Sequence, residues 1–508
     1  MNVPGCATGI RRTDSDVRIL SGVLTHRGQG LIGLLTVTAI LASCSSPPST
    51  TETPEVHYTA PSTSRPVVDL AFTVSDDLES IAGTEKVTFT PDQQVCEVVF
   101  RAWPNKPATA ERGNSMIVSS ISVDGASLPV VTEAAGAPSG SPGTLVRAEL
   151  PECVSAGTQV SADVAFEVHL GRRTDERMGH APREDVAWFG SAYPMLAWVN
   201  GRGWQENPAV DVVGEMAASD AFELRDLAVS APSRYKVAAV GEQTRSSAGE
   251  AEGTTTHHFT SPAVRDVAVV VGDLVITQVD GGPVPVIVAM PAGSSRIKGT
   301  AQEWADETSG MLSALEKHFG TYPYDRVWVQ VLPGVSDGVE YGEAFQIAGR
   351  HTPYESRWLI AHELAHAWFY GLVGNNQGEN PWLDESFATY AQELVDPSGL
   401  AERQYPGLSG RLGEPMTWWN TSAEHRGEYE DTVYSGGAWA LLQARAAVGG
   451  ERFDSLIRDY LAAHAHGFVG PADLETALRT EPEALRPLQV NIIRQVNMQG
   501  DTGYAVGQ

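Results

Sequence analysis

Two histidines and a glutamate stand close together in the segment AHELAHAWFYG, residues 361–371. His362 and His366 are four residues apart, so on a helix their rings project from one face and can share one metal ion. Glu363 follows the first histidine, where its carboxylate can reach a water molecule activated by that metal and act as a general base. The segment therefore indicates a metal site with hydrolytic chemistry.

A third ligand is needed, because a catalytic zinc site uses three protein ligands and keeps one position for water. The third ligand is expected downstream, where Glu385 in WLDESFATY is a candidate with 18 residues between it and His366. The spacing excludes the metzincin pattern, which needs histidine at position 372 and glycine at position 369, where this chain has Leu372 and Phe369.

The helix with the two histidines has a second, apolar face. This stripe can bury the helix without using the histidines, so a plain core helix is the weaker interpretation. We expect its members to be buried: Trp358, Ala361, Ala365, Trp368 and Leu372.

The elements that must position these residues change in character along the chain. From Val67 to about Asp273, short alternating runs such as VVDLAFTV predict an all-β domain of sandwich or saddle type. The glycine- and serine-rich stretch at 246–256 is expected as an exposed loop. Beyond about residue 275 helical spacing dominates, apart from a strand at 327–332. This order predicts a multidomain protein with its catalytic residues on the later, mainly helical part.

The N-terminal region predicts export. An apolar run from Leu31 to Ala42 is too short for an ordinary membrane span and ends in Leu-Ala-Ser-Cys at Cys44, which resembles the lipobox of bacterial lipoproteins. That resemblance implies removal of residues 1–43 and a lipid anchor on Cys44. Residues 44–66, rich in Ser, Thr and Pro, are expected as a disordered tether. A cleaved signal with an incidental cysteine is the alternative.

Net charge and cysteine content indicate which partners and which cellular compartment suit this chain. The 508 residues carry a formal net charge of −28, which argues against nucleic acid, because such binding depends on Lys and Arg neutralising phosphates. Cys96 and Cys153 are the two cysteines left for the folded part. Outside the cytoplasm they can form a disulfide, and two buried free thiols are the alternative.

Several blocks together resemble the aminopeptidase N family of zinc metallopeptidases, which are gluzincins. HELAHAWFYGLV, the 18-residue spacer and WLDESFATY are similar to the HExxH and WLNEGFA blocks of that family. Upstream, DGVEYGEAF stands in the place of its GAMEN motif, with Glu340 on the motif's glutamate. Downstream, VYSGGAWALLQ puts Tyr434 on its catalytic tyrosine. The resemblance is sharp from about Gly320 to Gly449.

The resemblance implies a role for each site residue. His362, His366 and Glu385 would bind one zinc ion, and Glu363 would be the general base. N-terminal residues would be removed from peptides by attack of zinc-bound water.

Two further roles follow from the same resemblance. Tyr434 would donate to the oxyanion, and Glu340 would bind the α-ammonium of the substrate. The implied fold is a β-saddle domain over 67–275, followed by a thermolysin-like α/β, mainly α, catalytic domain over 276–495.

Other functions stay open. The GAMEN block is altered to Asp-Gly-Val-Glu-Tyr at 337–341, which favours a zinc endopeptidase with an open cleft as one alternative. A non-catalytic zinc-containing lipoprotein, whose β domain binds a partner, is the other. The expected substrates are peptides, and the expected location is extracytoplasmic, lipid-anchored to a bacterial membrane through Cys44.

Overall fold

The computed structural model describes residues 56–493, except 172, 175–176, 213–218 and 404–409. The predicted leader, Cys44 and the first part of the tether lie outside the described residues. All described residues belong to one compact unit. Within this part of the chain, no helix is both long enough and apolar enough to cross a membrane.

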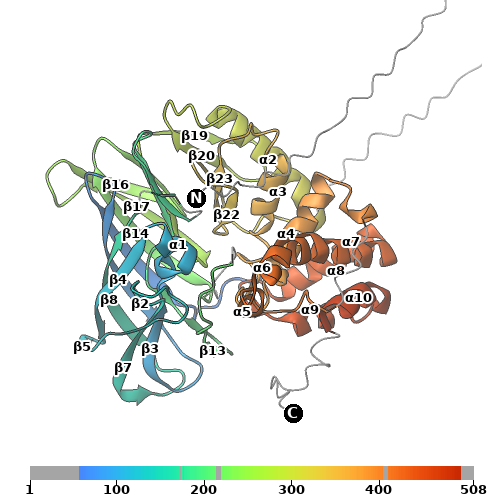
Figure 1. Cartoon of the computed structure of the whole chain (residues 1–508), viewed down its shortest axis with the longest axis horizontal. Helices are drawn as coiled ribbons and strands as arrows, with labels where there is room; N and C mark the ends of the chain where they lie inside the picture. The colour runs from blue at the N-terminus through green and yellow to red at the C-terminus, as the bar shows by residue number, and fades with distance from the viewer. Residues whose placement is uncertain (1–55, 172, 175–176, 213–218, 404–409, 494–508) are drawn as a thin grey trace, which may run out of the picture. The chain divides into compact units, whose positions relative to one another are not determined.

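An eight-stranded sheet forms the larger part of the N-terminal domain, drawn in blue and green in Figure 1. Apolar and polar side chains alternate along β1 and β8, so that one face of each strand is buried and the other is accessible to solvent. The strands run in the order β16 (Glu242–Ala248), β17 (Thr254–Val264), β14 (Phe222–Pro232), β1 (Val67–Val74), β2 (Ser80–Phe89), β8 (Val160–His169), β4 (Ser115–Val123) and β5 (Ala126–Leu128).

The β domain also contains two four-stranded sheets and a two-stranded sheet of β12 (Trp198–Val199) and β13 (Gly203–Trp204). One four-stranded sheet has the order β15 (Lys236–Ala239), β18 (Ala268–Gly272), β10 (Val186–Gly190), β9 (Met178–Ala181). The other four-stranded sheet has the order β11 (Met195–Leu196), β3 (Val95–Arg101), β7 (Leu145–Val154), β6 (Val131–Glu133). All residues of β10 and β18 are buried, so these strands lie inside the core. The expected disulfide is present and joins Cys96 on β3 to Cys153 on β7.

The second part of the chain begins with a mixed five-stranded sheet. Its order is β19 (Leu274–Val279), β20 (Val286–Pro291), β21 (Val327–Leu332), β23 (Ala344–Ala348), β22 (Gly338–Glu340). The parallel pairs β20–β21 and β21–β23 are buried, and β22 is antiparallel to β23 at the edge. The edge position leaves one side of the β22 backbone without a neighbouring strand.

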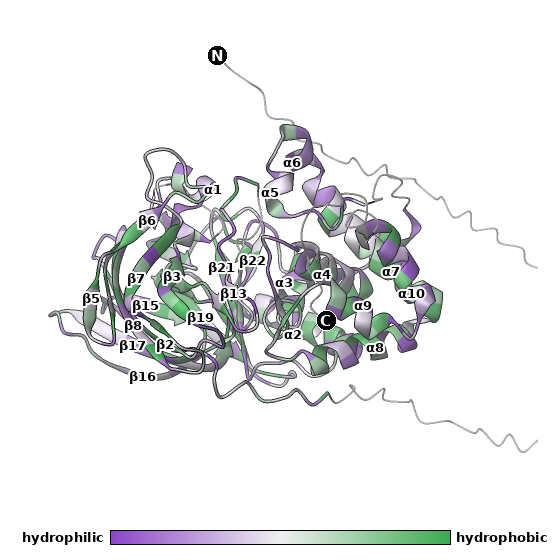
Figure 2. Ribbon diagram, turned by 90° about the horizontal axis from the view of Figure 1, so that it is seen from below, coloured by the Kyte–Doolittle hydropathy of each residue, from purple (hydrophilic) through white to green (hydrophobic). Residues whose placement is uncertain are grey.

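Helices pack beside this sheet and fill the C-terminal half, where Figure 2 shows hydrophobic and hydrophilic residues alternating along them. Helix α2 has a Thr300–Glu303 capping box and ends at Gly320, whose positive φ of 86° suits a residue without a side chain. The helices are α2 (Ala301–Phe319), α3 (Arg357–Ala365), α4 (Trp382–Val395), α5 (Met416–Trp419), α6 (Ala423–Tyr429), a π-helix (Glu430–Gly436), α7 (Gly437–Val448), α8 (Gly450–Ala463), α9 (Pro471–Leu478) and α10 (Pro482–Leu488).

Two details differ from the sequence expectations. Trp358 is 42 % exposed, because it lies in the first turn of α3, beyond the stretch that neighbouring elements cover. The rest of the expected stripe is buried. Of the expected loop at 246–256, residues 246–248 belong to strand β16 and residues 254–256 to strand β17. All side chains of β16 are exposed, so it shows no apolar alternation.

The described part of the expected tether also differs from a disordered chain. Tyr58 donates a hydrogen bond to the backbone oxygen of Thr321 over 2.7 Å and accepts one from the Trp368 indole over 3.1 Å. Arg65 binds Glu223 on β14. Tyr58 and Arg65 lie in the segment that was expected as a disordered tether, and they attach it to both parts of the fold.

Candidate active site

The two histidines are carried by α3, whose start is fixed by local hydrogen bonds. Thr352 and Glu355 cap one another: the Glu355 carboxylate accepts from the Thr352 backbone, and the Thr352 hydroxyl accepts from Glu355. Ser356 then donates to the Thr352 carbonyl, which extends the helical turn into α3. Residues 359–365 are buried, so the rings of His362 and His366 emerge inside the protein.

Helix α4 supplies the third residue. It starts after Pro381, packs against α3 and has Glu385 in its first turn. Proline is well suited to a helix start, because the first turn needs no backbone donor from it. The helix runs from Trp382 to Val395, within the part of the chain where the sequence predicts mainly helices.

The three predicted ligands converge on one point. Nε2 of His362 lies 3.2 Å from Oε2 of Glu385 and 3.3 Å from Nε2 of His366, and the remaining His366–Glu385 distance is 3.6 Å. Ligands bonded to zinc at about 2.0–2.1 Å in a tetrahedron stand about 3.3 Å apart. These distances and this donor set of two imidazoles and one carboxylate therefore fit a zinc ion with one open position.

Outer contacts orient the imidazoles. Nδ1 of His366 donates to the backbone oxygen of Phe369 over 3.2 Å, which leaves Nε2 as the ligand atom. Thr389 lies 3.5 Å from Nδ1 of His362. Burial lowers the pKa of His362 to about 4, so the imidazole is neutral at physiological pH, as a metal ligand must be.

Glu363 is buried beside the ligands and has an unsatisfied oxygen. Its Oε2 makes no hydrogen bond to any described residue. Burial raises the pKa of Glu363 well above its usual range, and the nearby carboxylates of Glu340 and Glu385 add to the rise. A bound cation acts in the opposite direction and favours the ionised carboxylate. The position suits a group that exchanges a proton with a water molecule at the metal.

The edge strand β22 passes directly over Glu363. A Cβ atom added to Gly338 would stand 2.2 Å from Oε1 of Glu363, so only glycine leaves room for the carboxylate in its present position. Glu340 follows Gly338 by two residues on the same strand and is 3 % exposed. Carboxylate or imidazole atoms of Glu340, Glu363 and His366 lie within 4.8 Å of one another. The predicted amine-binding residue thus borders the metal centre.

Tyr434 reaches the site from the π-helix. Its ring is stacked on that of His362, with centroids 5.9 Å apart and an angle of 7° between the planes. All six residues predicted from sequence therefore gather in one place, and each of their roles stays a prediction.

The sequence interpretation missed two residues that bind Glu340. Arg177, one residue before β9, places Nη2 3.3 Å from Oε1 of Glu340, and Gln377 donates to the same oxygen over 3.4 Å. Arg177 is 163 residues from Glu340 in the chain. No local pattern marks it, because the contact arises only when the β domain packs on the edge strand.

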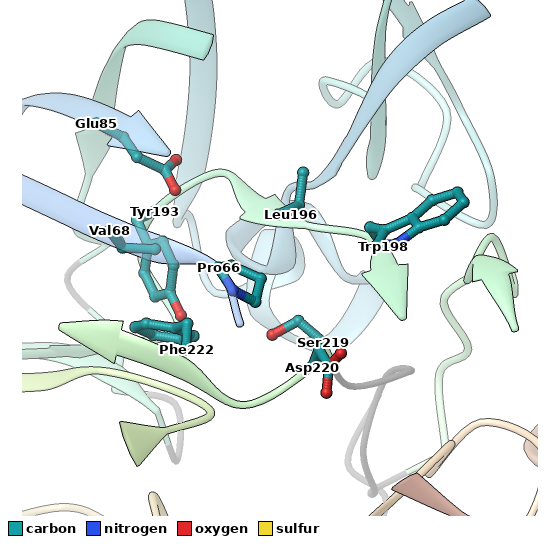
Figure 3. A pocket seen from close by; sticks show the side chains of 9 residues that line it. All are labelled: Pro66, Val68, Glu85, Tyr193, Leu196, Trp198, Ser219, Asp220 and Phe222. Atoms are coloured by element: carbon teal, nitrogen blue, oxygen red, sulfur yellow. The ribbon is translucent and has the colours of Figure 1, made fainter. Parts of the chain in front are cut away.

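A separate cavity lies in the β domain, and its lining includes none of the residues just described. It has a volume of about 10 Å³, which is room for one water molecule, and Figure 3 shows Glu85, Tyr193 and Asp220 among its nine lining residues. Both carboxylate oxygens of Glu85 lack a hydrogen bond to any described residue, and burial raises the pKa of Glu85 well above its usual range. This cavity is too small for a peptide.

Comparison with known proteins gives one family match. Residues 349–405, which hold both histidines and Glu385, match the Peptidase family M1 domain. Human Aminopeptidase RNPEPL1 is 31 % identical over 185 residues, covering 33 % of this chain and 23 % of that protein. Aminopeptidase N of Streptomyces lividans is 29 % identical over 136 residues, covering 23 % of this chain and 16 % of that protein. The chain spans about a quarter of the length of the first curated relatives.

Solved structures match over most of the chain. An M1 zinc metallopeptidase of Deinococcus radiodurans, bound to a Tyr-Ser-Ala substrate, has a TM-score of 0.62 at 20 % identity and covers 84 % of this chain and 94 % of its own. A two-domain M1 zinc metallopeptidase bound to L-arginine has a TM-score of 0.62 at 21 % identity, with the same coverage. The predicted order of an N-terminal β domain and a later, mainly helical domain is confirmed. A short segment of the chain therefore matches the Peptidase family M1 domain, and the chain has the fold of the M1 zinc metallopeptidases.

Proposed function

We propose that this protein is a zinc-dependent aminopeptidase that removes N-terminal residues from peptides. The observation that carries the proposal is the meeting of His362, His366 and Glu385 at the distances of a tetrahedral zinc site, with Glu363 buried next to them. A structural zinc site is normally closed by four protein ligands, whereas this set leaves a position open.

Glu363 and Tyr434 have separate roles in the proposed hydrolysis of the peptide bond. When bound, zinc lowers the pKa of a water molecule and polarises the scissile carbonyl. Glu363 accepts the proton of the attacking water and returns it to the leaving amine. Its burial keeps bulk water from competing for that proton. The hydroxyl of Tyr434, beside His362, donates a hydrogen bond to the oxyanion that develops on the former carbonyl oxygen.

Strand β22 binds the substrate in this proposal. As an edge strand it has one side without a neighbouring strand, where an extended peptide can pair with its backbone. Glu340 at its end presents a carboxylate to the α-ammonium group, which only the first residue of a peptide carries. A charged hydrogen bond at this point fixes the cleavage one residue from the N-terminus.

Zinc content tests the metal part of the proposal separately from activity. We expect one zinc ion per chain in the wild type, in Glu363→Gln and in the exposed-histidine control His169→Ala, and loss of zinc in His362→Ala. Glu363→Gln should retain zinc yet lose peptide hydrolysis by at least about 10²-fold. Equal zinc in the wild type and His362→Ala would contradict the assigned ligands.

A zinc endopeptidase is the second candidate, and one observation favours it. Glu340 already has Arg177 as an ionic partner, so the α-ammonium group has a competitor for the carboxylate. An endopeptidase predicts that Glu340→Ala leaves internal cleavage of long peptides unchanged. The aminopeptidase proposal predicts a loss of activity on short peptides with a free amine in the same variant.

We further propose that the protein works outside the cytoplasm, held by a lipid on Cys44. The apolar run that ends at Cys44 supports an exported chain, and the Cys96–Cys153 disulfide suits an oxidising compartment. Cys44→Ala tests the anchor. We expect the protein to move from the membrane fraction to the soluble fraction and to lose labelling by a fatty-acid probe, and retention of both would exclude lipidation at Cys44.

A further inference from the structure

The carboxylate of Glu340 is already oriented by other side chains. Its Oε1 accepts hydrogen bonds from Arg177 over 3.3 Å and from Gln377 over 3.4 Å. Both of these contacts engage the same oxygen atom. Oε2, the second oxygen, accepts no hydrogen bond from the residues that the structure describes. One oxygen is therefore held, and the other is available to a ligand.

Arg177 is itself fixed from several sides. Its guanidinium carbon lies 5.0 Å from the centre of the Trp103 ring and 5.3 Å from the centre of the Tyr341 ring. Nη1 lies 4.0 Å from the Asp266 carboxylate and 3.5 Å from the backbone oxygen of Glu340. The side chain of Arg177 is 3 % exposed. A planar cation between two rings has little freedom, so it holds its hydrogen-bond partner in one orientation.

These contacts join the two parts of the fold at the substrate site. Trp103, Arg177 and Asp266 belong to the β domain, whereas Tyr341 and Glu340 belong to the segment around β22. An arginine that served only to join the two domains would not need to bind a carboxylate at the metal centre. Arg265 shows such a contact, because it binds the backbone oxygens of Gly371 and Gly467.

We propose that Arg177 is a positioning residue for amine recognition: with Gln377 it holds Oε1 of Glu340, so that Oε2 faces the α-ammonium group of the substrate. This inference rests on the proposed aminopeptidase function. It makes the selectivity of the catalytic part for free N-termini depend on a side chain of the β domain. Without Arg177, Glu340 loses its charged partner, turns among several rotamers and binds the ammonium group less well.

The test measures binding of an amine without turnover. In zinc-loaded, full-length protein in detergent with the background substitution Glu363→Gln, titration calorimetry gives the Kd of L-leucinamide and of N-acetyl-L-leucinamide. We expect Arg177→Met to raise the Kd of L-leucinamide at least tenfold, a typical effect for a charged hydrogen bond. The Kd of the acetylated form should not change. Arg177→Lys should restore part of the affinity, because it returns the charge without the planar fork.

A double-mutant cycle separates positioning from a structural role. Once Glu340→Gln has removed the carboxylate, Arg177→Met should cause little further loss of L-leucinamide affinity. Arg265→Met is the matched control, since it removes another buried interdomain arginine. It should lower the Tm without changing the preference for the free amine. In wild-type protein, Arg177→Met should raise KM for free-amine substrates more than it lowers kcat.

The outcomes distinguish this inference from the proposed function. If the parent protein prefers L-leucinamide to its acetylated form and Arg177→Met keeps that Kd, Arg177 does not position Glu340. An equal loss of affinity in the presence and absence of Glu340 would also overturn the inference. If the parent shows no preference for the free amine, both the inference and the aminopeptidase proposal fail. Should Arg177→Met not fold, Arg177→Lys decides, with wild-type affinity as the contradicting result.

Discussion

Gly338→Ala is the smallest change that should inactivate the site without touching a metal ligand. The added Cβ would stand 2.2 Å from Oε1, 2.5 Å from Cδ and 2.7 Å from Cγ of Glu363. Ordinary van der Waals contact begins at about 3.4 Å, so the carboxylate must move by about 1 Å. The atoms that must move are the end of a flexible side chain, which limits the cost in stability to about 1 kcal/mol.

The effect on catalysis should be much larger than the effect on stability. A displacement of about 1 Å in a catalytic group can cost about 10²-fold in rate, which corresponds to about 2.7 kcal/mol in activation free energy. We therefore expect kcat/KM on a free-amine peptide to fall by about 10²-fold, while the zinc content stays at the wild-type level. The fall should appear mainly in kcat, because Glu340 and the metal ligands keep their places.

The chain offers a matched glycine for comparison. Gly310 is exposed in the middle of α2, and a Cβ added there meets nothing within 4 Å. Gly310→Ala should leave kcat/KM unchanged and stabilise the protein by up to about 1 kcal/mol. Steady-state kinetics, zinc analysis and thermal unfolding of both variants complete the assay. Wild-type kcat/KM in Gly338→Ala, at normal zinc content, would refute the assignment of Glu363 as the base.

Three further predictions concern other parts of the protein. Tyr434→Phe should lower kcat by about 10²–10³-fold with zinc content unchanged, and an unaltered kcat would exclude it as the oxyanion donor. Replacing Cys96 and Cys153 together by serine should lower the unfolding free energy in urea by up to about 4 kcal/mol, since the bond closes a loop with a sequence separation of 57, and an unchanged value would show that the bond adds no stability. Burial raises the pKa of Glu343 from 4.5 to about 7, so the folded chain keeps this proton to higher pH than the unfolded chain, and stability falls as pH rises between these values. Glu343→Gln should therefore remove up to about 3 kcal/mol of that fall. Urea unfolding at pH 5 and pH 8 measures the fall, and an equal loss of unfolding free energy in the wild type and the variant would contradict this reasoning.

The two histidine ligands could be predicted from sequence because they depend on local spacing. Residues four apart on a helix share a face wherever the helix lies, so His362 and His366 had to be neighbours. Glu385 followed from the resemblance of its block to the aminopeptidase N family, and α4 then placed it beside them. The strand at 327–332 was predictable from its own local pattern.

Contacts between distant segments could not be predicted in this way. Arg177 approaches Glu340 through packing of the β domain on β22, and Gln377 approaches it from the segment between β24 (Gly374–Asn375) and α4, so neither contact leaves a periodic trace in the sequence. The exposed Trp358 shows a related limit: helical spacing gives the face of a residue but not where the covering elements end. Strand β16 has no buried side chain, so its pairing with β17 leaves no apolar alternation to detect.

One measurement tests the central claim most directly. The zinc-loaded, full-length protein in detergent is incubated with one peptide in two forms, with a free and with an acetylated N-terminus, and the products are identified by mass spectrometry. Glu363→Gln serves as the blank. An aminopeptidase that depends on Glu340 predicts stepwise loss of single residues from the free form alone. Internal cleavage of both forms, or cleavage of neither, would contradict it.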